Sequence, residues 1–114
     1  MANTFKNRTL RAVGTSPVDV GAVVAADTQT TLIGMTLANV TSGVISVTVT
    51  LKDSEDSPGP YTTHIVKDAP IPTGGSLIVV GGDQKIVLMT GDKIIVTSNT
   101  ASSADVIMSF QEIT

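Results

Sequence analysis

At positions 45–52 the chain reads Ile-Ser-Val-Thr-Val-Thr-Leu-Lys. Successive side chains of a β-strand point to opposite faces of the sheet. One face of this segment would carry Ile45, Val47, Val49 and Leu51, and the other Ser46, Thr48, Thr50 and Lys52. A hydrophobic period of two residues is typical of a half-buried strand. The segment therefore predicts a strand whose apolar face lies on a core.

The rest of the chain has the same character. It is rich in Val, Ile and Thr, whose branched Cβ atoms suit a pleated sheet. No segment repeats apolar residues at helical spacing over successive turns. Further strands are expected at residues 18–25, 31–39, 61–66, 77–80, 85–90 and 105–113, with a bulge at Gly34. The sequence thus predicts an all-β fold, a single antiparallel β-sandwich of jelly-roll or immunoglobulin-like type with essentially no helix.

The chain of 114 residues is long enough for one domain, which we assign to residues 14–114. Residues 1–13 differ, because they carry Lys6, Arg8 and Arg11, three of the seven Lys and Arg residues. Neither face of this segment is apolar. Two interpretations stay open: a basic arm that docks on an acidic partner surface, or an edge strand whose Lys and Arg prevent stray pairing.

The composition argues against several classes of function. The absence of Cys excludes disulfides and thiolate zinc sites, and a net charge of −3 offers no basic field for nucleic acid. Aromatic residues make up 3%, too few for base-stacking platforms or typical sugar-binding grooves. No apolar run approaches the roughly 18 residues of a membrane helix. We expect no cofactor, nucleic acid, membrane or small-molecule substrate.

Catalytic chemistry is equally poorly supported. A catalytic triad or a zinc site would have to be built around His64, the single histidine, which we interpret as an ordinary strand residue. Asp53, Glu55 and Asp56 lie together in the irregular segment 53–60, and calcium takes carboxylate ligands from such loops. Their spacing is not that of an EF-hand, so a solvated loop is favoured over a calcium site. The sequence predicts a protein that is not an enzyme.

The segment 85–96 suggests that the protein binds to another protein molecule. Residues 77–80 and 85–90 are expected to form one hairpin, and Thr90-Gly91-Asp92-Lys93 is expected to close a second. That second hairpin would carry Val87, Met89, Ile94 and Val96 on one face and Ile86, Leu88 and Ile95 on the other. A sandwich hides only one face of each sheet. We therefore expect the second face to be covered by another molecule or by the chain's own arm or loops. The candidate interface residues are Lys6, Arg8, Arg11, Ile86, Leu88 and Ile95.

Several segments together carry a resemblance to a known family. They are Asn-Thr-Phe-Lys-Asn at 3–7, His-Ile-Val-Lys-Asp-Ala-Pro-Ile-Pro-Thr-Gly-Gly-Ser-Leu at 64–77, Gly-Asp-Gln-Lys-Ile at 82–86, Leu-Met-Thr-Gly-Asp-Lys-Ile at 88–94, Ala-Ser-Ser-Ala-Asp-Val at 101–106 and Glu-Ile at 112–113. In these the chain resembles small β-sandwich structural proteins of tailed bacteriophages, especially marine and cyanobacterial ones, similar to head decoration or cement proteins. Segments 18–27 and 53–60 depart from that pattern.

The resemblance implies a structural role in the virion, with no catalytic residues to carry over. We expect a capsid decoration or cement protein that stabilises the head through contacts of its sandwich and N-terminal arm. Its partners would be the major capsid protein, other virion proteins or copies of itself, in a particle assembled in the cytoplasm of a bacterial host. A neck or tail component and a host-surface binding module are the alternatives, and a hydrolase built on His64 comes last.

Overall fold

The computed structural model describes residues 3–20, 24–53, 62–81 and 84–113. The described residues form strands and connecting segments, with no helix among them, so the all-β prediction is confirmed. The strands are β1 (Asn3–Val13), β2 (Val18–Asp19), β3 (Gln29–Asn39), β4 (Ile45–Lys52), β5 (Thr62–Ile71), β6 (Ser76–Val80), β7 (Ile86–Leu88), β8 (Lys93–Ser98) and β9 (Ala104–Ile113).

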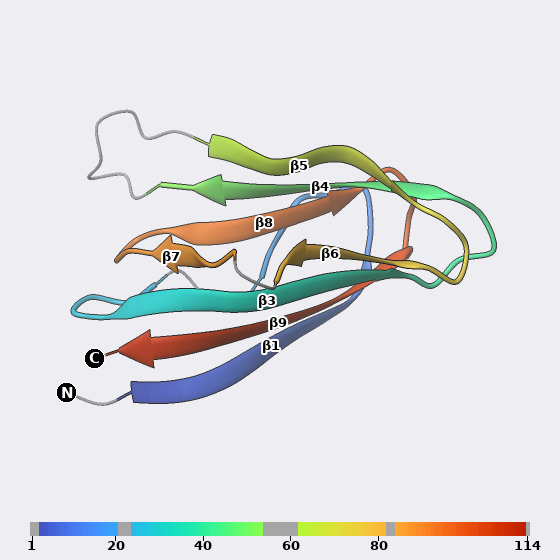
Figure 1. The fold of residues 1–114 in the computed structure, drawn as a ribbon. Coiled ribbons are helices and arrows are strands. Elements are labelled where there is room, and N and C mark those ends of the chain that lie inside the picture. The colour runs from blue at the N-terminus through green and yellow to red at the C-terminus, as the bar shows by residue number, and fades with distance from the viewer. Residues whose placement is uncertain (1–2, 21–23, 54–61, 82–83, 114) are drawn as a thin grey trace.

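The strands form two antiparallel sheets that pack face to face, as predicted for a sandwich (Figure 1). The five-stranded sheet has the order β1-β9-β3-β6, and β7 pairs with β3 on the same side as β6. The four-stranded sheet has the order β2-β8-β4-β5. Apolar side chains from the facing sides of both sheets make one core.

The alternation of residues 45–52 is confirmed in β4. Ile45, Val47 and Val49 are at most 1% exposed, and Leu51 is half-buried against the core. Their hydroxyl-bearing neighbours lie on the other side of the sheet. Fully burying an aliphatic side chain of this size contributes about 1.5–3 kcal/mol before chain entropy is subtracted, so this strand is a main anchor of the four-stranded sheet.

The bulge expected at Gly34 is present in β3. Pairing with β9 shifts between Leu32, opposite Phe110, and Gly34, opposite Ser109. The extra residue reverses which positions point inward. Leu32 is buried before the bulge and Met35 after it, so both halves of the strand contribute to the core.

Two strand boundaries differ from the prediction. β5 continues through Pro70 to Ile71, where a loop was expected, because β5 is an edge strand and the missing N–H of Pro70 costs it no ladder bond on the open side. Of the strand expected at 18–25, residues 18–19 form β2, and residues 21–23 lie outside the described ranges. The amide of Val20 donates to the Ile94 carbonyl at 2.8 Å.

The hairpin expected between residues 77–80 and 85–90 is wrong. Thr36 pairs with Ile78 and Thr31 pairs with Val87, so β6 and β7 follow one another along the same edge of β3. Their arrows point the same way in Figure 1. The chain does not reverse direction between them; β6 and β7 are two halves of one interrupted edge strand.

The second expected hairpin is also wrong, because β7 pairs with β3 and β8 pairs with β4 and β2. The turn between them is tight: the Asp92 amide donates to the Met89 carbonyl at 2.9 Å, and the Met89 amide donates to Asp92 Oδ2 at 2.9 Å. It carries the chain from one sheet to the other. The physical reason is burial: the expected two-residue hairpin would put Leu88 and Ile94 on opposite faces, whereas strands in facing sheets bury both.

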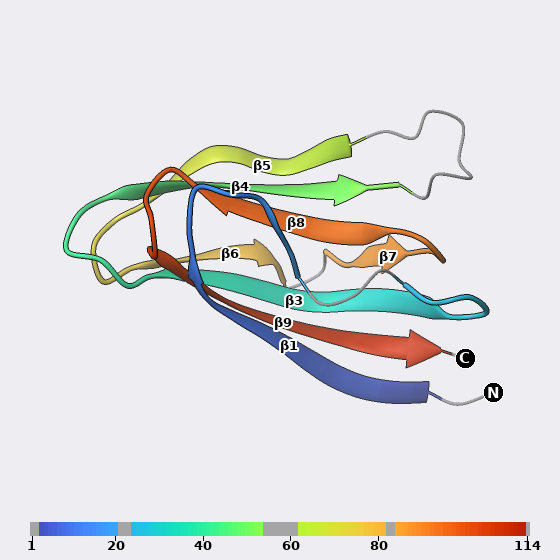
Figure 2. The ribbon, with the colours of Figure 1, turned by 180° about the vertical axis from the view of Figure 1, so that it is seen from behind.

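A second crossing lies at the opposite end of β8. The Ser98 amide donates to the Gly14 carbonyl and the Ser103 amide to the Val13 carbonyl, each at 2.9 Å. Figure 2 shows the segment after β1 and the segment before β9 running side by side between the two sheets. These bonds fix the start of β9 against the end of β1.

Candidate interaction surfaces

The three apolar residues of the predicted interface do not share a surface. Leu88 is 3% exposed and belongs to the core, and Ile86 is half-buried against it. Ile95 lies in the other sheet, opposite Thr50. The apolar surface that the sequence placed on Ile86, Leu88 and Ile95 is therefore not formed, since the two strands that carry these residues are not paired with each other.

Two of the three predicted basic residues lie together. Lys6 and Arg8 share the inward side of β1, opposite Phe110 and Met108 of β9. The Lys6 ammonium lies 2.6 Å from Glu112 Oε1, and the Arg8 guanidinium carbon lies 5.6 Å from the centre of the Phe110 ring. Arg11 points to the outer side of the same sheet. Residues 3–13 are thus the edge strand of the five-stranded sheet, paired with β9 along most of their length.

An exposed apolar surface lies on the outer side of the five-stranded sheet. Half of the large hydrophobic residues that are exposed in the described chain are here: Phe5, Ile78, Val87 and Ile107, between 52% and 73% exposed. Pairing arranges them in two rows across the strands, Phe5–Gln111–Thr31–Val87 and Thr9–Ile107–Thr36–Ile78, with Asn7 and Ser109 between. We call these ten residues the neutral face.

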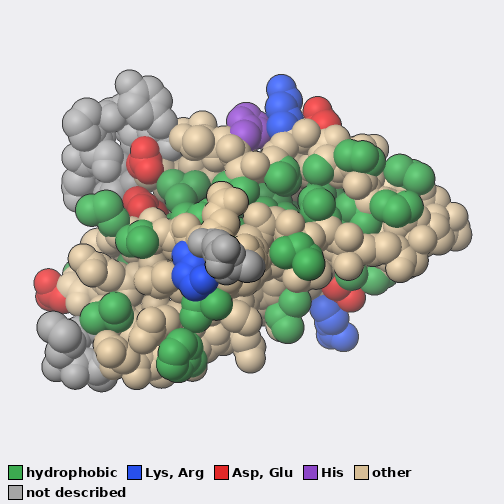
Figure 3. Space-filling view, viewed as in Figure 1, with side chains coloured by type: hydrophobic (Ala, Val, Ile, Leu, Met, Phe, Trp, Pro, Cys, Tyr) green, Lys and Arg blue, Asp and Glu red, His purple; other side chains and the backbone are tan. Residues whose placement is uncertain are grey.

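Few charges lie on that surface. Among the strand residues on the outer side of the five-stranded sheet, the charged ones are Arg11 and Asp105, and Asp105 Oδ1 accepts a hydrogen bond from the Ala12 amide at 3.0 Å. The exposed Lys85 directly precedes β7, two residues from Val87. Figure 3, which views both sheets, shows hydrophobic side chains among polar uncharged ones, with Lys and Arg in a few separate places. The ten residues of the neutral face themselves carry no charge.

The outer side of the four-stranded sheet is different. Its strands present Lys52, Lys93 and His64, and the Lys93 ammonium lies 3.5 Å from Asp19 Oδ2. Of the large hydrophobic residues exposed in the described chain, one lies on a strand of this sheet: Val18 of β2, 36% exposed, which pairs with the buried Val96 and so is on the inner side. Charges and hydroxyls keep such a face hydrated, so the two outer faces of the sandwich are chemically unequal.

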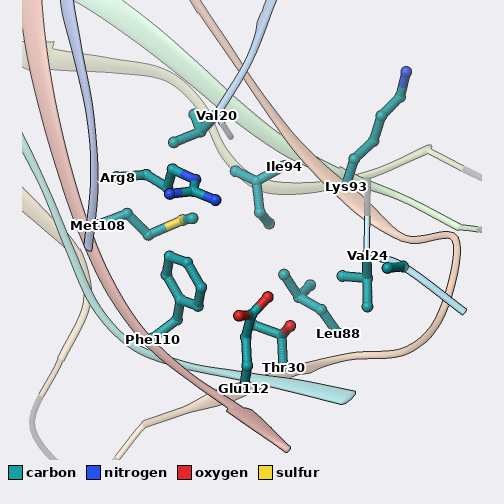
Figure 4. A pocket seen from close by; sticks show the side chains of 11 residues that line it. Arg8, Val20, Val24, Thr30, Leu88, Lys93, Ile94, Met108, Phe110 and Glu112 are labelled. Carbon is teal, nitrogen blue, oxygen red and sulfur yellow. The ribbon is translucent and has the colours of Figure 1, made fainter. Parts of the chain in front are cut away.

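A cavity of about 150 Å³ lies between the sheets, beside β1. Its walls are mostly apolar and include Leu88, Ile94, Met108 and Phe110. Figure 4 shows Arg8 reaching into it from β1, whereas the ammonium of Lys93 points away. Arg8, Thr30, Lys93 and Glu112 also line this space, so the inward side of the β1 edge presents charged and polar groups next to apolar side chains.

The described residues bring no catalytic or metal-binding group together. His64 is exposed on β5 opposite Thr50, and no group of three His, Asp or Glu residues in the described ranges could hold a metal ion. In the acidic segment 53–60, which we interpreted as a loop, residues 54–60 lie outside the described ranges. No helix in the described chain is long and apolar enough to cross a membrane.

Comparison with known proteins identifies the fold but no family. No protein family matches the sequence, and neither does any curated protein. Among solved structures, a chain of the T13 viral particle of infectious bursal disease virus is similar over 96% of this chain, with a TM-score of 0.57 and 11% identity. The match covers 30% of that longer chain. At this identity the likeness shows a shared sandwich fold.

Two further structures align with lower scores. Endospore appendages of Bacillus, which form disulfide-linked pili, align over 97% of this chain and 84% of theirs, with a TM-score of 0.49 and 11% identity. A chain of the Gx strain of infectious bursal disease virus aligns over 96% of this chain and 29% of its own, with a TM-score of 0.49 and 14% identity.

Proposed function

We propose that the chain is a non-enzymatic structural protein of a bacteriophage virion, a decoration or cement protein of the capsid. The observation that carries the proposal is the neutral face, with Ile78 and Ile107 69% and 52% exposed. Four exposed apolar side chains are gathered here among uncharged polar ones, and exposed apolar surface is a candidate for contact with other proteins. A face of aliphatic, hydroxyl and amide groups suits burial against a protein surface.

The size of the neutral face fits a weak individual contact. Four strands about 4.8 Å apart, each contributing about five residues of about 3.3 Å, span roughly 300 Å². A standard protein interface buries about 800 Å² on each partner. One copy would bind a capsid subunit or another copy through this face modestly, and many copies linked on one shell would act together.

The proposed location in a virion is supported by similarity to known proteins. The sandwich is similar to a segment of a viral particle chain, and the sequence resembles small virion proteins of tailed phages. Both support a search for this protein in virions, with the major capsid protein, other virion proteins or further copies as its partners. A protein that cements a capsid needs a second contact surface, and we assign this to the edge of β1 that carries Lys6 and Arg8.

Quantitative mass spectrometry of purified particles tests the proposal. Hundreds of copies per particle are expected for a protein that decorates the head. A dozen or fewer would place the protein at the neck or tail instead, and its absence from particles would overturn the virion role.

A pair of variants tests whether the neutral face is the surface that attaches the protein to the particle. Ile107→Asp puts a charge in the middle of that face and should sharply reduce the number of copies per particle. His64→Asp, the matched control, adds the same charge to the exposed outer side of the other sheet and should leave the number unchanged. Equal incorporation of both variants would exclude the neutral face as the contact.

A further inference from the structure

The β1 strand has the one long open edge among the described strands. It contains 11 residues and no proline, and it keeps one register with β9 from Asn3 to Leu10. Of the other edge strands, β2 has 2 residues, and β6 and β7 have 5 and 3. β5 is interrupted by Pro70, by the positive φ of Asp68 and by two shifts of register against β4.

An open edge of this kind can take up another strand. Its outward N–H and C=O groups have no strand beside them, and Figure 1 shows β1 at the margin of the sheet with β9 on its other side. Proteins block such edges with short strands, prolines, bulges and inward-pointing charges. The first three are present on the other three edges of this sandwich, whereas over residues 3–10 β1 has only the charges of Lys6 and Arg8, which oppose a basic strand and not an acidic one.

The side chains of β1 define what could pair with it. On the inward side stand Lys6 and Arg8, and the strand contains no Asp or Glu. Arg8 forms no ion pair within the described residues, and Lys6 forms one, with Glu112. On the outward side, Phe5, Asn7 and Thr9 belong to the neutral face. The edge is basic on one side and uncharged on the other.

A second copy of β1 fits this edge poorly in the registers centred on the middle of residues 3–10. Two-fold antiparallel pairing centred on Asn7 would place Lys6 opposite Arg8, and pairing centred on Arg8 would place the two Arg8 side chains opposite each other. Like charges directly across a strand pair destabilise it. The same positions favour a strand with acidic residues.

We propose that the β1 edge accepts an extended acidic segment of a different chain as an additional strand. Its Asp or Glu residues, spaced two apart, would lie beside Lys6 and Arg8, and its intervening Val or Thr residues would extend the neutral face beside Phe5 and Thr9. Main-chain bonds would supply affinity and the charges would supply specificity. The inference rests on the proposed function for the partner's place in a particle, whereas the binding itself is a property of the isolated chain.

A synthetic peptide of about ten residues that alternates Glu with Val and Thr tests the binding. Titrated into the full-length protein at low salt, it should bind and shift the amide NMR signals of β1 and β9. Replacing every Glu by Gln should weaken binding at least about tenfold. No binding up to about 1 mM would overturn the inference without touching the virion role, which is decided on particles.

Backbone methylation separates strand addition from simple charge attraction. Alternate amides of an added strand face β1 and the remainder face away. The Glu peptide N-methylated on one alternate set should therefore lose binding, and the peptide methylated on the other set should keep it. Equal affinity of the two methylated peptides would exclude strand addition.

Charge reversal identifies the residues. The Lys6→Glu/Arg8→Glu variant should bind the Glu peptide at least about tenfold more weakly and should bind the corresponding Lys peptide instead. The matched control is Lys67→Glu, an exposed basic residue of β5, which should bind the Glu peptide as the wild type does. Circular dichroism establishes that the variants are folded, and Arg8→Gln replaces the double variant if it is not. Unchanged binding by a folded variant would remove these residues from the contact.

Discussion

Ile78 of β6 and Ile107 of β9 lie on either side of Thr36 in one row across the outer side of the five-stranded sheet. Both are more than half exposed. Side chains that stay in water contribute little to the stability of their own fold. The exposure of these two isoleucines therefore fits the proposed contact with another molecule better than a role in the folding of the isolated chain.

Replacing Ile78 by Ser is expected to leave the isolated domain almost as stable as the wild type. Surface substitutions of this kind change the free energy of unfolding by about 0.5 kcal/mol or less. Urea denaturation measures the change. A loss above about 1.5 kcal/mol would mean that Ile78 belongs to the core of the free chain.

Leu88 and Val87 are expected to respond very differently to truncation. Leu88 is 3% exposed and Val87 is 61% exposed. Leu88→Ala should cost about 2–5 kcal/mol, and Val87→Ala should cost about 0.5 kcal/mol. Chemical denaturation of both variants compares the costs. The two costs would be similar or reversed if β7 paired with β8, because that hairpin would put Leu88 on an outer face.

A charge at Val47 should abolish folding. Val47 is fully buried in β4, and an unpaired carboxylate there would lose its hydration without gaining a partner. Val47→Asp should show no cooperative thermal unfolding by circular dichroism. Thr97→Asp, in the adjacent strand but on the outer side of the sheet, should still unfold cooperatively. A soluble, cooperatively melting Val47→Asp protein would contradict the assignment of the inner face.

The buried hydroxyls of Ser98 and Ser103 should be energetically coupled. Their Oγ atoms lie 2.5 Å apart, and Ser103 Oγ also donates to the Thr100 carbonyl at 2.8 Å. Ser103→Ala leaves buried polar groups without partners and should cost about 1–3 kcal/mol. The Ser98→Ala/Ser103→Ala protein should be less destabilised than the sum of the single variants. Additive losses in the four-protein cycle would show that the hydroxyls act independently.

Part of the candidate site could be found from the sequence. The cluster of basic residues near the start of the chain was visible directly, and alternation placed Lys6 and Arg8 on one side and Arg11 on the other. The neutral face was missed. Its signal was present as uncharged outward positions in 29–39 and 104–113, but only the order of strands shows that Phe5, Ile78, Val87 and Ile107 come to one surface.

The sequence by itself determined that the chain is an all-β sandwich, which face of β4 is buried and where β3 bulges. These follow from local rules: a side-chain period of two and the missing Cβ of Gly34. Only the tertiary structure decided which strands pair. The apolar residues before and after Gly91 are compatible with a hairpin and equally with an arch that connects the two sheets. The periodicity of a strand shows which of its faces is apolar, but it does not show which sheet the strand joins. The two-residue hairpin would put Leu88 and Ile94 on opposite faces, whereas strands in facing sheets bury both, and that long-range gain favours the arch.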